Sequence, residues 1–110
     1  MNTGPFDTLA HADANSPRPT AEVLEESEGA HGWIFRVAIA RPGAETTEHE
    51  ISLAWVDHDH WTAGLVPPSR LIERLAVAAA EHRPDLPPRF DAARARRWMP
   101  ELDELLSSLR

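Results

Sequence analysis

The sequence contains no cysteine and no lysine, and it has only five glycines in 110 residues. Without cysteine, the chain can form neither a disulfide framework nor a thiolate metal site. The glycines form no phosphate-binding loop, and no serine lies in a Gly-x-Ser-x-Gly turn, so two common catalytic motifs are excluded. All eleven basic residues are arginine, and the chain also contains 17 alanines. This combination indicates a bias toward GC-rich codons more than selection for the chemistry of the guanidinium group.

Long hydrophobic runs are also missing. The longest uninterrupted apolar run, Leu75 to Ala80, is far shorter than the roughly 20 residues that a membrane-spanning helix needs. The N-terminus lacks the basic region followed by an apolar stretch that marks a secretion signal. We therefore expect a cytoplasmic protein that makes no use of a membrane.

Acidic side chains outnumber basic ones by 18 to 11, which gives a formal net charge of −7. Hydrophobic residues make up 42% of the chain, but many are alanine, so the core depends on few large side chains. Length and composition together predict one small acidic domain. Because residues 1–19 are rich in proline and poor in bulky apolar side chains, we expect a flexible arm there and a single domain over residues 20–110.

The clearest structural signal is a β-hairpin. Gly32 to Ala40 and Thr46 to Val56 are rich in β-branched and aromatic residues, and Pro42 and Gly43 supply a turn between them. One register satisfies both faces, because it places apolar residues opposite each other on one face and Arg36 opposite Glu50 on the other. The apolar face pairs Trp33 with Leu53, Phe35 with Ile51, Val37 with His49, and Ile39 with Thr47. Thr20 to Glu26 predicts a further strand.

The second half of the chain changes to helical periodicity. Pro67 and Pro68 open a helix that ends near Arg83, before Pro84. Asp91 suits the N-cap of a short helix from Ala92 to Trp98. A last helix follows Pro100, with leucines at helical spacing. We predict an α+β fold, a three-stranded antiparallel meander with one face covered by two or three helices.

Several short motifs together resemble a type of small bacterial protein. They are His49-Glu50-Ile51-Ser52-Leu53, Gly64, Pro67-Pro68-Ser69-Arg70, Arg89-Phe90-Asp91 and Pro100-Glu101-Leu102. Proteins of this type run from a β-meander through a helix to an Arg-Phe-Asp turn and an aromatic-Pro-Glu turn. The resemblance covers residues 20–109 and implies this architecture, but it implies no activity. The chain departs from the type at Trp98-Met99-Pro100, where an aromatic residue is expected directly before the proline.

Residues 57–60 form a cluster of two aspartates and two histidines, which are metal ligands for zinc, iron or manganese. In a continuing strand His58 and His60 point to one face, and His31 lies at the same end of the hairpin. A metal-dependent enzyme using His31, His58 and His60 is therefore one hypothesis. The alternative is a polar strand end whose side chains cap the next turn. His49 shares the apolar face and is expected to be a half-buried, hydrogen-bonded histidine.

The only basic patch runs from Arg89 to Arg97. With Phe90 and Trp98 interleaved, Arg94 and Arg97 are candidates for nucleic-acid contact. The acidic chain as a whole repels phosphates, so we do not expect a nucleic-acid partner as the leading case. In the alternative reading, Arg94 stacks on Trp98 while its neighbours pair with Glu101, Asp103 or Glu104.

Three of the four tryptophans lie in or just after the predicted hairpin. Trp33 and Trp55 fall on the apolar face and are predicted to be core residues. Trp61 follows a charged run, so it is either an anchor for a partner or a plug at the sheet–helix junction.

The leading hypothesis is a non-enzymatic protein-binding or adaptor module without a cofactor, which docks through an exposed sheet edge and the Trp61 region. The candidate partner-binding residues are Trp61, Ile34, Val56, Arg94 and Arg97.

Overall fold

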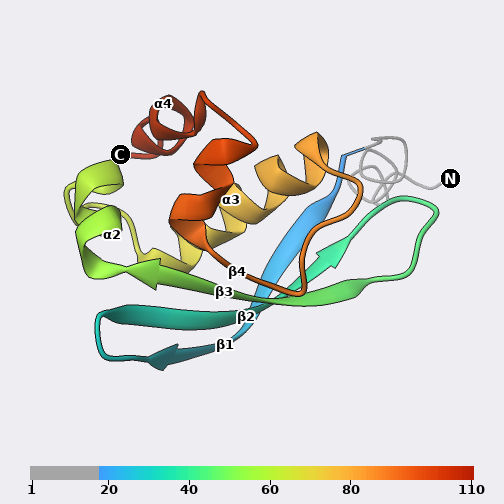
Figure 1. Cartoon of the computed structure of the whole chain (residues 1–110), viewed down its shortest axis with the longest axis horizontal. Coiled ribbons are helices and arrows are strands. Elements are labelled where there is room, and N and C mark those ends of the chain that lie inside the picture. The colour runs from blue at the N-terminus through green and yellow to red at the C-terminus, as the bar shows by residue number, and fades with distance from the viewer. Residues whose placement is uncertain (1–17) are drawn as a thin grey trace, which may run out of the picture.

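A four-stranded sheet forms the base of the computed structural model, which describes residues 18–110 (Figure 1). Strands β1 (Thr20–Glu28), β2 (Gly32–Ala40) and β3 (Thr47–Ala54) form the antiparallel meander that the sequence predicts. The predicted register is confirmed, since Trp33 pairs with Leu53 and Phe35 with Ile51. The α+β prediction is therefore confirmed, with one strand more than expected.

The additional strand is β4 (Arg89–Asp91), which pairs in parallel with β3. It is too short to show an alternating pattern, so periodicity could not reveal it. The amide of Glu50 donates to the carbonyl of Pro88 at 2.8 Å, which is the hydrogen bond expected at the start of the parallel Glu50–Arg89 pair. A parallel pair requires a crossover connection, and the helices between β3 and β4 supply it.

Strand β3 ends at Ala54, two residues earlier than predicted, and helix α2 (Trp55–Thr62) follows directly. The amide of Trp55 donates to the carbonyl of His31 at 3.0 Å, so the first turn of α2 is fixed to the β1–β2 turn. Ala63 and Gly64 adopt positive φ and end the helix. The Asp-His run at residues 57–60 is therefore helical, whereas both hypotheses for this run assume that it continues the strand.

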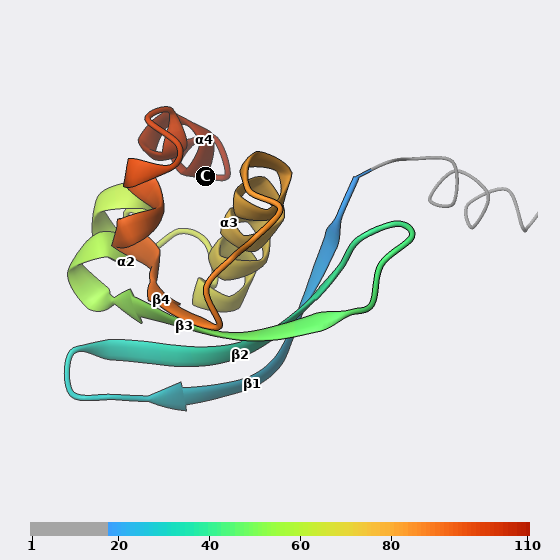
Figure 2. The ribbon, with the colours of Figure 1, turned by 45° about the vertical axis from the view of Figure 1, so that its right-hand side comes forward.

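The helices cover one face of the sheet (Figures 1 and 2). Helix α3 (Pro68–His82) ends before Pro84, as predicted, and buries one apolar stripe, which includes Leu71, Ile72, Leu75, Ala76 and Ala79. The 3₁₀ helix η1 (Ala92–Arg97) and helix α4 (Leu102–Ser107) complete the layer. The buried core consists chiefly of Phe35, Val37, Ile39, Ile51, Leu53, Trp61, Leu71, Ile72, Leu75, Met99, Leu102 and Leu106.

Two side chains tie the sheet to the connections of the helical layer. The guanidinium of Arg41 donates to the carbonyls of Ala80 and Arg83, at 2.8 and 2.9 Å. His49 is 6% exposed and bridges Thr47 Oγ1 and the carbonyl of Pro87 through its two ring nitrogens. The expectation of a hydrogen-bonded histidine is thus confirmed, although His49 is buried and not half-buried, and its role is to hold the link that leads into β4.

Within residues 18–110, no helix is both long enough and apolar enough to span a bilayer. The predicted arm, residues 1–19, lies outside the described part of the chain except for Arg18 and Pro19. Arg18 Nε lies 2.9 Å from Glu81 Oε2 on α3.

Candidate functional site

The outer edge of β1 is the longest stretch of strand edge left without a partner in the described chain. Leu24 forms a bulge, because Val23 pairs with Val37 while Glu25 already pairs with Arg36. Before the bulge, the amide of Val23 donates to Glu73 Oε2 of α3 at 3.2 Å, so α3 occupies that half of the edge. After the bulge, residues Leu24–Glu28 have β2 on one side only, and we call this segment the free β1 edge.

The free β1 edge is acidic and exposed. Glu25, Glu26 and Glu28 all lie in solvent, and Leu24 is 41% exposed at the bulge. Charged residues on an edge strand are a common protection against unwanted strand pairing. They also restrict pairing to segments of opposite charge, so the edge disfavours most strands but still accepts a basic one.

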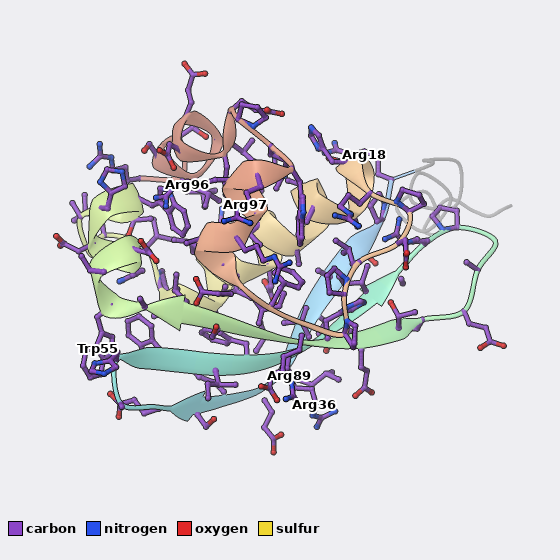
Figure 3. All side chains as sticks on the ribbon, viewed as in Figure 1. Arg18, Arg36, Trp55, Arg89, Arg96 and Arg97 are labelled. Carbon is purple, nitrogen blue, oxygen red and sulfur yellow. The ribbon has the colours of Figure 1, made fainter. Side chains whose placement is uncertain are left out.

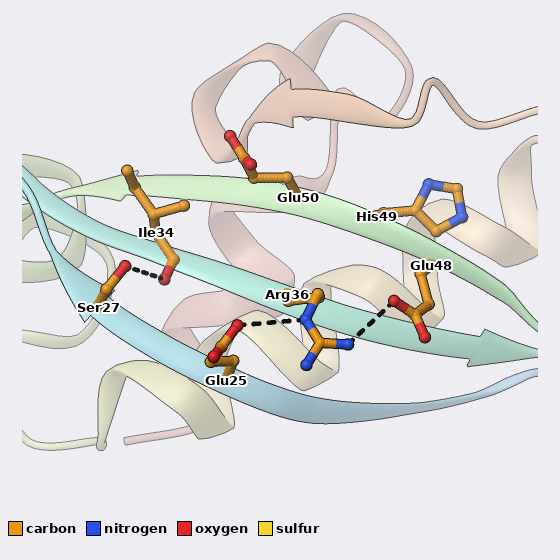
Figure 4. Close-up of a pocket in the computed structure, with 7 residues that line it drawn as sticks. All are labelled: Glu25, Ser27, Ile34, Arg36, Glu48, His49 and Glu50. Carbon is orange, nitrogen blue, oxygen red and sulfur yellow. Dashed lines mark hydrogen bonds and ion pairs between the residues drawn. The ribbon is translucent and has the colours of Figure 1, made fainter.

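The sheet face away from the helices adjoins this edge and is open (Figure 4). A shallow hollow of about 250 Å³ lies on it, lined by Glu25, Ser27, Ile34, Arg36, Glu48, His49 and Glu50. Arg36 lies between Glu25 Oε1 at 3.2 Å and Glu48 Oε1 at 3.0 Å. Hydrogen bonds to Glu48 and then Glu25 raise the pKa of Arg36. These side chains are exposed, so the ion pairs contribute little to stability.

The structure corrects the predicted role of Trp55 and decides between the two roles considered for Trp61. Trp61 is completely buried, and its Nε1 donates to Asp103 Oδ1 at 2.6 Å. It is therefore unavailable as a partner anchor and instead plugs the sheet–helix junction. Trp55, predicted as core, is instead 44% exposed at the start of α2 (Figure 3). Its ring lies edge-on to that of Trp33. The early end of β3 explains the exposure of Trp55, because helical spacing replaces the alternation of a strand.

The other two predicted apolar partner residues are exposed but do not share one sheet face. Ile34 is 38% exposed on the open face, whereas Val56 is 72% exposed on α2. Between the β1–β2 turn and the end of β3, a second hollow of about 210 Å³ borders Ile34. Small residues line much of it, among them Gly32, Ser52 and Ala54. The open face thus has an apolar end near Trp55 and a charged middle at Arg36.

The three histidines of the metal hypothesis are not brought together. His58 and His60 are two residues apart on a helix, which separates their directions by roughly 200°. His58 Nε2 lies 2.6 Å from the carbonyl of Val66, and His60 Nε2 lies 3.9 Å from Asp103 Oδ2. In the described residues, no three His, Asp or Glu side chains are grouped so that they could hold a metal ion.

A polar network instead joins α2, η1 and α4. Arg96 Nε donates to Asp103 Oδ1 at 2.8 Å, and its guanidinium lies 4.8 Å from the ring centroid of Trp61. The hydrogen bonds from Trp61 and Arg96 lower the pKa of Asp103. Asp57 behaves oppositely, because partial burial raises its pKa, although Arg96 opposes the shift. The predicted pairing of an η1 arginine with Asp103 is therefore present, and it serves packing.

The remaining basic residues are arranged by the 3₁₀ geometry of η1. Asp91 caps this helix as predicted, because its Oδ2 accepts from the amide of Ala93 at 3.0 Å. With three residues per turn, Arg94 and Arg97 lie on one line, and together with Ala93 they border an open hollow.

Trp98 is stacked by Arg83 at 4.8 Å, not by Arg94 as predicted. Arg89 lies 3.6 Å from Glu50, on the open-face side that also carries Arg36 (Figure 3).

Comparisons with known proteins return no match: no protein-family model, no curated protein and no solved structure is similar to this chain.

Proposed function

We propose that the protein is a non-enzymatic protein-binding module that accepts an extended, basic segment of another protein along the free β1 edge. The observation that carries this proposal is the outward edge of Leu24–Glu28, which pairs with β2 on one side and has no neighbouring strand on the other. A strand added there gains main-chain hydrogen bonds, which is a recurrent way in which domains recognise peptides.

Charge complementarity selects the partner. Glu25 adjoins Glu48 and Glu50 on the open face, and Glu26 and Glu28 lie on the other side of the same edge strand. Arg36 is already paired with Glu25 and Glu48. A second copy of β1 would place glutamates opposite glutamates, which destabilises a cross-strand pair. A partner strand rich in lysine or arginine instead places positive charges opposite these glutamates. The attraction raises both the affinity of the complex and the rate of association.

The bulge at Leu24 sets the limit of the docking segment. Beyond it, Glu73 already accepts from the amide of Val23, so an added strand can pair along Leu24–Glu28 only. Such a short interface gives transient binding, because few main-chain hydrogen bonds form and ordering the incoming segment costs free energy. Exposed Leu24 and Ile34 provide the nearest apolar contacts for the partner's side chains.

A peptide of alternating lysine and valine, blocked at both ends, tests the proposal. In an NMR titration we expect the largest amide shifts in Leu24–Glu28, with slowed hydrogen exchange at the same amides. A second peptide with the same side chains but N-methylated on every residue has lost its main-chain donors on both edges. It should bind at least about tenfold more weakly if strand pairing is responsible. Equal binding of both peptides would reduce the interaction to charge alone and would contradict the proposal.

A charge-matched pair of variants locates the site. Glu26→Lys with Glu28→Lys reverses two charges on the free β1 edge, whereas Glu45→Lys with Glu104→Lys makes the same change in net charge elsewhere. All four glutamates are exposed. We expect the first double variant to lose the peptide and the second to keep it. If both lose it equally, the peptide senses net charge and not the edge.

Nucleic-acid binding through Arg94 and Arg97 is the second candidate, favoured by their alignment along η1. Two aligned arginines release few counterions, so any binding to mixed oligonucleotides is expected to be weak and lost at moderate salt. Arg94→Gln with Arg97→Gln should abolish whatever binding a low-salt titration detects. Binding that survives this double variant would remove these arginines from consideration.

A further inference from the structure

The outer side of α3 carries a small hollow of about 180 Å³, separate from the free β1 edge. Arg70 and Arg74 lie one helical turn apart on α3 and face the same side. Glu73 and Val77 complete the α3 wall, and Leu109 near the C-terminus closes the hollow from the other side. Two cationic side chains, one acid and two apolar side chains therefore line the same space.

Arg74 is the unusual member of this group. Its Nη1 atom is buried and has no hydrogen-bond partner, and it is the only such buried side-chain atom within residues 18–110. A buried guanidinium donor without an acceptor carries the cost of its desolvation with no compensating bond. Native structures satisfy nearly all such groups, so an orphaned donor beside a hollow indicates an acceptor that arrives from outside the chain.

We propose that the hollow at Arg70 and Arg74 binds a carboxylate attached to a small apolar group. Swinging into the hollow, the Arg74 guanidinium can offer the planar, two-pronged donor set that a carboxylate matches. Arg70 supplies the second positive charge at the rim. Val77 and Leu109 receive the apolar body of the ligand.

The charge of the site selects a monoanion. Arg70, Arg74 and Glu73 together give the hollow a net charge of +1. The carboxylate of Glu73 stays beside the hollow while it accepts a hydrogen bond from the amide of Val23. A dianion such as phosphate meets that carboxylate at short range and is disfavoured. The ligand chemistry could come from a peptide C-terminus or from a short acyl chain, because both end in a carboxylate next to apolar carbon.

Side-chain NMR of the full chain tests this site directly. The Nε–Hε resonances of Arg70 and Arg74 and the amide of Leu109 are followed during titration with N-acetyl-leucine, hexanoate, N-acetyl-leucinamide and inorganic phosphate. We expect saturable shifts with N-acetyl-leucine or hexanoate, and the stronger of the two identifies the source of the carboxylate. N-acetyl-leucinamide has the same apolar body without the charge and should produce no saturable shift.

Variants keep the test decisive. Arg74→Gln should weaken carboxylate binding at least about tenfold, measured at the Leu109 amide, while Arg94→Gln on η1 should leave it unchanged. Because Arg74→Gln removes the buried Nη1 donor that has no acceptor, the melting temperature of this variant should be no lower than that of the native chain. Phosphate binding as tight as the carboxylates would indicate an adventitious ion only. That outcome would overturn the proposal, as would the absence of saturation or equal binding by Arg74→Gln.

Discussion

At the scale of single residues, one hydrogen bond, from Trp61 to Asp103, allows a large side chain to be buried. Trp61 follows a charged run, yet it is fully buried because Asp103 receives its indole N–H. A buried tryptophan generally needs such a partner. The same carboxylate also receives Arg96, so one acid joins three separate elements.

The opposite pKa shifts of Asp57 and Asp103 give a matched prediction. The pKa of Asp103 is lowered below 3.8, so its charge stabilises the fold above that pH and the contribution is lost as the pH falls through the lowered value. Asp103→Asn should therefore lower the melting temperature at neutral pH. The gap from the native chain should close under strongly acidic conditions.

Asp57→Asn is expected to act in the other direction. Burial raises the pKa of Asp57 above 3.8, so the folded state holds its proton more tightly and loses stability as the pH rises through the raised value. The neutral amide should melt slightly higher than the native chain at neutral pH and no higher below pH 3.8. Thermal melts of both variants across pH check the pair of signs. A common sign would show that the shifts do not govern stability.

Gly32 supplies a second prediction at this scale. A Cβ built on Gly32 would lie 2.0 Å from the carbonyl oxygen of Leu53 and 2.7 Å from Ala54 Cα, both backbone atoms of β3. Gly32→Ala should therefore destabilise the protein by about 2 kcal/mol or more, because the two strands must move apart. Gly29→Ala is the control, since its Cβ would meet ordinary contacts of 3.7 Å. Urea unfolding of both variants measures the difference, and equal midpoints would contradict the expectation.

At the scale of elements, the register of β2 and β3 could be predicted because two faces constrain it at once. A shift by one residue would expose Phe35 and Ile51 and bury Arg36. The start of α2 could not be predicted, since Trp55 and Val56 suit a strand as well as a helix. Strand β4 has three residues and no period, and its pairing depends on His49 and Pro87 meeting across the fold.

The candidate site was predictable only in part, for the same reason. An exposed sheet edge follows from any meander, but the bulge at Leu24 and the Glu73 contact that divide it depend on tertiary packing. Burial of Trp61 depends on Asp103, which lies 42 residues further along the chain. The hollow at Arg70 and Arg74 is likewise invisible in the sequence, because Leu109 reaches it only after the chain has folded.

Arg41 carries the prediction that belongs to this scale. It bonds the last carbonyls around the C-terminus of α3 and so joins the β2–β3 turn to the helical layer. Arg41→Ala should cost about 1–2 kcal/mol, because two charge-assisted hydrogen bonds are lost where the group is partly buried. Arg41→Lys should recover only part of this loss, since an ammonium cannot fork between two carbonyls as a guanidinium does. Chemical denaturation of the two variants gives the comparison, and full recovery by lysine would refute the bidentate role.

At the scale of the whole molecule, charge is divided between the two layers. The four strands carry seven acids and two arginines, whereas the helices α2, α3, η1 and α4 carry six acids and five arginines. The sheet is therefore the acidic layer, and the helical layer is close to neutral. Such a division orients an approaching basic partner toward the sheet before contact is made.

This division predicts a strong salt dependence of docking. Association of the lysine–valine peptide should slow markedly between low and physiological ionic strength, while its dissociation should change little, because steering acts on the encounter. Stopped-flow fluorescence of a dye-labelled peptide separates the two rates. If only the dissociation rate depended on salt, the charges would act within the bound interface and not during the encounter.

The parallel pairing of β4 with β3 also has a consequence for synthesis on the ribosome. The first three strands are complete at Ala54, but the elements that cover their apolar face end only at Ser107. A nascent chain that has emerged as far as His82 has α3 but neither the closing strand nor the last two helices. Trp33 and Phe35 then face an unfinished interior, so stalling or truncation in this interval should yield aggregation-prone fragments, and the final quarter of the chain completes the fold.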